Sequence, residues 1–148
     1  MTDKNGVEIT TGAIVEITGA YFKGDNALYF VTSSPGDSTW SGSDYSLHKV
    51  SKHGKVSTAK NRICFWPISV FVSSRAERAK ANEWNEAHAQ IEVKAIENMT
   101  EVRAYFEEKA EALRELMKRD AQWFGEDSEA VKRDQRMLDH YKAVLARI

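Results

Sequence analysis

The hydrophobic period of the sequence changes near Ser73, and this change constrains the fold more than any other feature. Before Ser73, apolar and polar residues alternate with a period near two, as in half-buried β-strands. After it, apolar residues recur with a period near 3.6, as in amphipathic helices. Both prolines and seven of the eight glycines lie in the first part. The sequence therefore predicts an α+β protein, with a β domain at residues 1–73 and a helical region at residues 74–148.

Turn signals divide the first part into short segments of β-type composition. Such spacing is typical of a small barrel or sandwich. A sheet of about 60 residues leaves long bare edges unless it closes, so a closed barrel is favoured. Residues 91–94 are a further candidate for the closing strand. The strands are predicted at residues 7–10, 13–18, 27–33, 45–51, 55–58, 62–66 and 69–73.

Residues 12–24, GAIVEITGAYFKG, resemble the KOW-type element of SH3-like barrels. That element has a glycine, a V-x-I strand, a short bend and a second glycine before the next strand. The resemblance implies an SH3-like barrel that binds RNA, ribosomal components or protein partners and is rarely an enzyme. Such elements often carry basic residues near the bend. Lys23 fits this pattern, and Asp25 departs from it. The whole chain also resembles small uncharacterised proteins of bacterial phages and mobile elements.

Residues that typically begin or end helices divide the second part of the chain into three predicted helices. The S-x-x-E pattern at residues 74–77 is a capping box and predicts a helix at residues 74–89. A long helix is predicted at residues 98–124, with Asn98 and Glu101 as capping residues and Gly125 as its stop. Ser128 begins a third helix at residues 128–147. The link between the last two helices is so short that they are predicted to form an antiparallel hairpin.

This helical hairpin is predicted to have one apolar seam. A barrel of about 70 residues is too small to cover two long helices along their whole length. Either the hairpin lies partly on the barrel, or it pairs with a second copy into a four-helix bundle. The homodimer is the favoured alternative. Its contact residues are predicted to be Val102, Phe106, Leu113, Met117, Leu138, Tyr141 and Leu145.

Composition restricts the environment and the partners. The formal net charge is −1, so the whole chain is not a polycation suited to nucleic acid. Cys64 is the single cysteine, which excludes an internal disulfide and fits a reducing compartment. The first residues are polar, and no segment approaches the roughly 20 apolar residues that cross a bilayer. A cytoplasmic protein without membrane contact is expected.

Motifs for catalysis or for a cofactor are missing from the sequence. The four histidines are scattered and no second cysteine joins them, whereas zinc needs three or four converging ligands. Cys64 lies in an apolar strand, where a core role is expected; a small hydrolase that uses Cys64 and a histidine is the remaining enzymatic alternative. No nucleophile-elbow or phosphate-loop pattern is present. The expected function is therefore non-enzymatic, with no cofactor and no metal.

A polar loop at residues 34–45 carries Trp40. This side chain either covers one end of the barrel or is an exposed anchor for a partner. Aromatic residues of the first bend could join it there. The predicted partner-binding residues are Tyr21, Phe22, Lys23, Trp40 and Tyr45. The leading hypothesis is a phage or mobile-element inhibitor that binds a bacterial protein or ribonucleoprotein target, as an anti-CRISPR protein does.

Residues 49–62 carry five basic residues and no acidic one. A positive hairpin of this kind suits phosphate contacts, and with the aromatic residues it predicts, as the alternative function, an RNA- or DNA-binding module. The competing interpretation is an edge hairpin whose lysines only prevent aggregation. The basic residues of the alternative are Lys49, Lys52, Lys55, Lys60 and Arg62.

Overall fold

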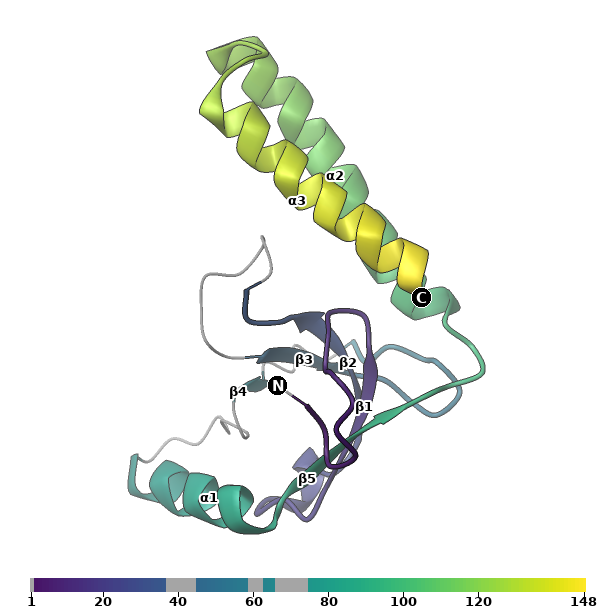
Figure 1. The fold of residues 1–148 in the computed structure, drawn as a ribbon, viewed down its shortest axis with the longest axis vertical. Coiled ribbons are helices and arrows are strands. Elements are labelled where there is room, and N and C mark those ends of the chain that lie inside the picture. Colours follow the sequence, from purple (N-terminus) through teal and green to yellow (C-terminus); the bar gives the residue numbers. More distant parts are fainter. Residues whose placement is uncertain (1, 37–44, 59–62, 66–74) are drawn as a thin grey trace.

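A computed structural model describes residues 2–36, 45–58, 63–65 and 75–148 of the chain (Figure 1). The described part is an α+β structure: four strands of an antiparallel sheet come first, three helices follow, and the fifth strand lies between the first two of these helices. In chain order the elements are β1 (Ile14–Thr18), the short 3-10 helix η1 (Lys23–Asp25), β2 (Leu28–Ser33), β3 (Tyr45–Lys49), β4 (Ile63–Phe65), α1 (Arg75–His88), β5 (Gln90–Lys94), α2 (Thr100–Phe124) and α3 (Glu129–Arg147).

The sheet is open. Its strand order is β4-β3-β2-β1-β5, and all four pairs of neighbours are antiparallel. The predicted closed barrel is therefore not what the described strands form. The physical reason is the position of β5. It pairs with β1 and forms one edge of the sheet, while β4 forms the opposite edge. A closed barrel would require β5 to pair with β4.

Most predicted elements are present with shifted ends. The predictions for residues 13–18, 27–33 and 45–51 correspond to β1, β2 and β3. Residues 7–10 and 55–58, in contrast, contribute only the isolated bridges Thr2–Glu8 and Val50–Val56. Residues 69–73 lie outside the described part. The edge strands β4 and β5, each with one neighbour, correspond to the predictions for residues 62–66 and 91–94.

The two faces of the sheet bury different sets of side chains because successive residues of a strand point to opposite faces. One face holds the buried residues Val15 and Ile17 of β1 and Tyr29 and Val31 of β2. The other face holds Ile14 and Phe30, which contact α2 and α3. The register places Ile14 opposite Phe30 and Val15 opposite Tyr29, so each face is continuous across the strands.

The α2–α3 arm, which consists of α2 and α3, packs its lower half on the second face. α3 returns alongside α2, and the arm extends away from the sheet along the long axis (Figure 1). Phe106 links the layers: its ring lies 6.0 Å from the ring of Phe30 and 6.2 Å from that of Tyr141. At the end of α3, the guanidinium of Arg147 donates to the carbonyl of Thr11, at 3.0 Å.

The predicted dimer contacts lie inside this intramolecular core. Five of the seven side chains are buried against the sheet or the other helix of the arm, and two are half-buried at its border. Because they are already packed within one chain, they are not free to form an intermolecular seam. The apolar stripes of the hairpin therefore no longer support a homodimer through these residues. The buried five are Val102, Phe106, Leu113, Leu138 and Tyr141; the half-buried two are Met117 and Leu145.

The helix ends follow the capping predictions in part. Ser128 caps α3, with its hydroxyl accepting from the amide of Val131 at 3.3 Å. At α2 the N-cap is Met99, which makes no side-chain cap, and Asn98 instead accepts from the amide of Thr100 at 3.0 Å. The predicted Asn98 cap therefore acts from one residue before the N-cap. Glu101 lies in the first turn of α2, where its negative charge interacts favourably with the positive end of the helix dipole.

The N-terminal segment is fixed by Asp3. Its carboxylate is buried and accepts hydrogen bonds at 2.8 Å from the amides of Asn5, Val7 and Val93. These bonds, chiefly the one from Val93, lower the pKa of Asp3 below its usual range. Because Val93 belongs to β5, this single carboxylate attaches the first residues to the outer edge of the sheet.

Candidate partner-binding site

Four rings gather on the surface where the first bend of the chain meets α1. This aromatic patch consists of Tyr21 and Phe22 from the bend and Trp84 and His88 from α1. The ring of Trp84 lies 4.1 Å from that of His88 and 6.4 Å from that of Tyr21, which in turn lies 5.0 Å from Phe22. Trp84 is 46% exposed and Tyr21 is 40% exposed. Such large exposed rings are the residue types that dominate binding energy at interfaces.

A shallow pocket lies on this patch. It has a volume of about 340 Å³ and is lined by Tyr21, Trp84 and His88 together with Lys80, Glu83 and Ala87. Lys80, Trp84 and His88 follow one another at intervals of four residues, so they share one stripe of α1. The pocket thus combines aromatic walls with one basic and one acidic side chain, both exposed. That combination can receive an apolar or a hydrogen-bonding side chain of a partner.

Buried polar groups hold the patch in place. Asn85 is fully buried, and its side-chain carbonyl accepts from the amide of Tyr21 at 2.8 Å. The indole of Trp84 donates through Nε1 to the carbonyl of Gly19 at 3.1 Å. Gly19 has a φ of 72°, and a Cβ at this position would approach the carbonyl oxygen of His88 to 2.7 Å. The bend and α1 therefore touch through their backbones, and the rings are positioned before any partner arrives.

Hydrogen bonds made by the side chains of Asn26 and of Tyr29 in β2 also hold the bend in place. The side-chain carbonyl of Asn26 accepts from the amide of Ala20 at 2.8 Å, and the Tyr29 hydroxyl donates to the carbonyl of Asp25 at 2.8 Å. Burial raises the pKa of Tyr29 well above its usual range, with a smaller contribution from the charge of Asp25. Burial also raises the pKa of Asp25. The neutral phenol is therefore a donor at every physiological pH.

The predicted partner-binding residues have three different outcomes. Tyr21 and Phe22 belong to the patch, and Lys23 follows them on the surface at the start of η1. Tyr45 is 6% exposed and packs in the core of the sheet, so a surface role for it does not fit the structure. The reason is its place in β3, where it alternates inward with Leu47. Trp40 lies outside the described residues.

Trp84 and His88 were missed by the sequence reasoning, which treated α1 only as a helix. A usable signal was present. The helix is polar overall, and its fully buried residues among those described are Ala81 and Asn85. The sequence itself shows that Trp84 is the one large apolar residue between Arg75 and His88, so this helix has no apolar stripe in which to bury it.

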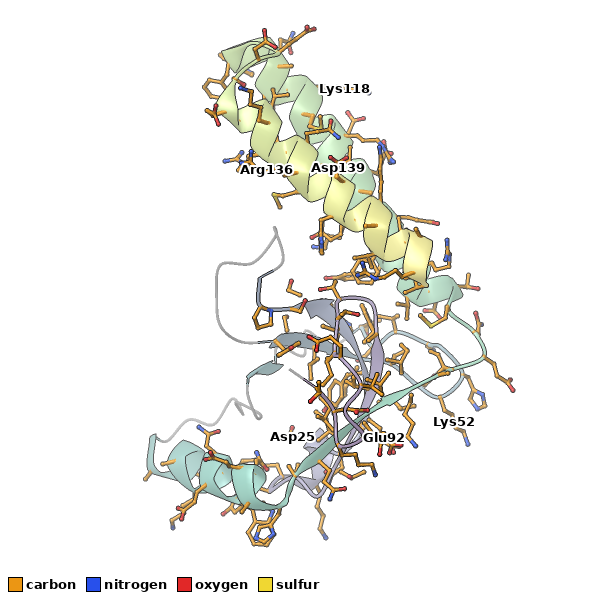
Figure 2. All side chains as sticks on the ribbon, viewed as in Figure 1. Asp25, Lys52, Glu92, Lys118, Arg136 and Asp139 are labelled. Atoms are coloured by element: carbon orange, nitrogen blue, oxygen red, sulfur yellow. The ribbon has the colours of Figure 1, made fainter. Side chains whose placement is uncertain are left out.

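The basic segment occupies a different surface. The Lys49 ammonium donates to the carbonyl of Gly24 at 2.7 Å, which ties β3 to η1. Lys52 and Lys55 are exposed on the turn that follows, and Figure 2 shows Lys52 pointing outward. A second shallow pocket of about 400 Å³ lies between Lys49 and Thr58. Lys60 and Arg62 lie outside the described residues.

Metal ligands and a catalytic cysteine are the remaining questions for the described residues. There, no three His, Cys, Asp or Glu side chains converge to hold a metal ion. Residue Cys64 of β4 pairs in register with Ser46 of β3. His48, the nearest histidine in that strand, packs its ring 5.3 Å from Phe30, and its Nε2 lies 2.7 Å from the carbonyl oxygen of Ser57. None of the helices in the described ranges has the length and apolar character of a membrane span.

Comparisons with protein-family models, with curated proteins and with solved structures found no match for this chain.

Proposed function

We propose that this chain is a non-enzymatic binding protein that docks a protein or ribonucleoprotein target through the aromatic patch. The observation that carries the proposal is the exposure of Trp84 and Tyr21 on a rigid base. Both side chains present large rings to solvent, while a buried asparagine and a backbone carbonyl fix their positions. Binding then immobilises few side chains, which reduces its entropic cost.

The finer identity of the protein belongs to the same proposal. The chain is proposed to be related to KOW-like, SH3-like proteins, with a sheet that stays open in the described strands, and to carry a long antiparallel helical hairpin. Its proposed role is that of a cytoplasmic inhibitor from a phage or mobile element, of the anti-CRISPR kind. The resemblance of residues 12–24 supports the first part. The aromatic and charged lining of the pocket on the patch supports the docking part.

The test is affinity capture from a bacterial lysate followed by a direct binding measurement on each purified candidate. Trp84→Ala and Tyr21→Ala should each weaken a genuine complex by at least about tenfold, since interface tryptophans and tyrosines contribute 1.4 kcal/mol or more. Val7→Ala is the matched control, because Val7 is an apolar side chain with a similar exposed fraction, 47%, at another surface. Circular dichroism must show that each variant is folded.

The proposal fails if capture depends on neither ring, or if Val7→Ala weakens the complex as much as Trp84→Ala does. If Tyr21→Ala and Trp84→Ala unfold the protein, their loss of binding does not report on the patch. In that case Trp84→Phe separates the two effects, since it removes the bond from Nε1 to Gly19 but retains an aromatic ring.

Direct nucleic-acid binding is the second candidate, and the exposed Lys52 and Lys55 beside the second pocket are the observation that favours it. A module that uses several phosphate contacts must lose affinity steeply between about 50 and 200 mM salt. Replacing Lys52 and Lys55 by glutamine should reduce both the affinity and the salt slope. Failure of RNA and DNA oligonucleotides to bind at low salt would eliminate this candidate and leave the first one intact.

A further inference from the structure

The free end of the α2–α3 arm carries the most exposed aromatic side chains among the described residues. Trp123 is 77% exposed and Phe124 is 68% exposed, and both lie in the last turn of α2. The apolar stripe of α2 continues through this turn, but α3 begins only at Glu129 and leaves the two rings uncovered. We call Trp123, Phe124, Glu126 and Asp127 the arm tip.

The charge around the arm tip has one sign. Residues 121–131 carry three acidic residues and no lysine or arginine. Glu126 and Asp127 are exposed, and no hydrogen bond or ion pair joins them to another described side chain. The next basic residue along the chain is Lys132, and its Nζ lies 3.6 Å from Oε1 of Glu129. Arg119 lies one helical turn closer to the sheet.

Exposed rings beside unpaired carboxylates are complementary to a cationic surface. A guanidinium can stack on an indole while it forms hydrogen bonds with a carboxylate, and lysine is a weaker fit to both groups. Phosphate groups would instead be repelled by the three acidic residues. A second copy of this chain would bring the same acidic residues to the interface, so self-association at this point is also opposed by charge.

The arm tip is separate from the aromatic patch. The arm reaches away from the sheet at one end of the long axis, whereas α1 lies at the other end (Figure 1). One partner surface at the patch and a different one at the arm tip can therefore be occupied together. The arm tip does not depend on the proposed function of the patch.

We propose that the arm tip is a docking surface for an arginine-rich segment of a partner protein. The rings of Trp123 and Phe124 provide the stacking surface, and Glu126 and Asp127 provide the acceptors. The arm presents both at a distance from the globular body, which allows the tip to reach a groove or a basic face on a larger target.

The probe for the test is a fluorescently labelled nona-arginine peptide, with nona-lysine for comparison, titrated with the full chain and followed by anisotropy. The Trp123→Ala, Phe124→Ala double variant should bind at least about tenfold more weakly. The Glu126→Gln, Asp127→Asn double variant should show a similar loss at about 50 mM salt and a smaller one at higher salt. Nona-lysine should bind more weakly than nona-arginine.

The matched control is Glu107→Gln with Glu108→Gln, which removes the same number of charges from an exposed face in the middle of α2. It should leave the affinity within about twofold. Equal loss in this control would mean that the peptide follows net charge only, and the proposal would be wrong. Absence of binding at low salt would overturn it too. Sedimentation velocity adds a third outcome: a dimer of the wild type that Trp123→Ala abolishes would assign the tip to a second copy instead.

Discussion

Asp134 should make the α2–α3 arm less stable at neutral pH than it would be with a neutral side chain. Its side chain is completely buried between the helices, close to Asp120 of α2, which is 8% exposed. The Arg133 guanidinium lies 3.4 Å from Oδ1 of Asp134 and 3.7 Å from Oδ2 of Asp120, but its side chain is 59% exposed and its charge is screened by water. Among the described residues, Oδ2 of Asp134 has no hydrogen-bond partner.

The direction of the pH dependence follows from the pKa. Burial raises the pKa of Asp134 above its ordinary value of 3.8, the neighbouring Asp120 raises it further, and Arg133 offsets part of this rise. A carboxyl whose pKa is higher in the folded state favours folding in its protonated form. The free energy of unfolding therefore decreases as the pH rises from about 3.8 through the raised pKa, and the loss is complete above it.

Asp134→Asn removes this loss and retains a similar shape. The amide can donate a hydrogen bond to the carboxylate of Asp120, and no second charge is buried. Relieving one unsatisfied buried polar group contributes about 1–2 kcal/mol, which corresponds to an increase of roughly 2–8 °C in Tm for a chain of this length. The gain should be largest at pH 7 and should decline toward pH 4.

Thermal unfolding followed by circular dichroism at several pH values tests this. Asp139→Asn is the matched control, because Asp139 is an exposed residue of the same helix and loses the same charge. Asp120→Asn should give part of the same gain, and the two gains should not add. If Asp134→Asn lowers the Tm at pH 7, or raises it equally at pH 4 and pH 7, the argument from buried repulsion is wrong.

Three further predictions concern the fold. Phe106→Ala should lower the free energy of unfolding by about 3–5 kcal/mol in urea, because its fully buried ring joins the sheet to the arm; a loss below about 1 kcal/mol would mean that the arm is not docked there. Gly54→Ala should cost at least about 1 kcal/mol more than Gly6→Ala, since both glycines have positive φ but only at Gly54 would a Cβ overlap the carbonyl oxygen of Asn98; equal losses would refute that contact. Asp3→Asn should lower the Tm at neutral pH, and the difference from wild type should shrink as the pH falls below 3.8 toward the lowered pKa of Asp3, because the contribution of the carboxylate exists only while it is ionised; a pH-independent difference would contradict this.

Local patterns were enough to predict the two halves and most elements. β1 and β2 are rich in β-branched and aromatic residues because both faces of the sheet are buried there, and the longer period in α2 and α3 comes from one buried face of each helix. Both features are visible in the sequence. The cap at Ser128 and the stop at Gly125 are also local, since each involves only neighbouring backbone groups. These features needed no knowledge of the other half of the chain.

Only the tertiary structure decided how the halves meet. The period of α2 shows that Phe106 is buried but not whether it faces Phe30 or a second copy of the chain, because the apolar stripe is the same in both cases. Likewise, residues 91–94 were a candidate strand from the sequence, but only the structure shows that this strand, β5, pairs with β1. The aromatic patch depends on Tyr21 and Trp84, which lie far apart in sequence and meet through a buried asparagine. Sequence alone thus determined which residues avoid water, whereas long-range packing determined which of them find each other and which rings stay exposed.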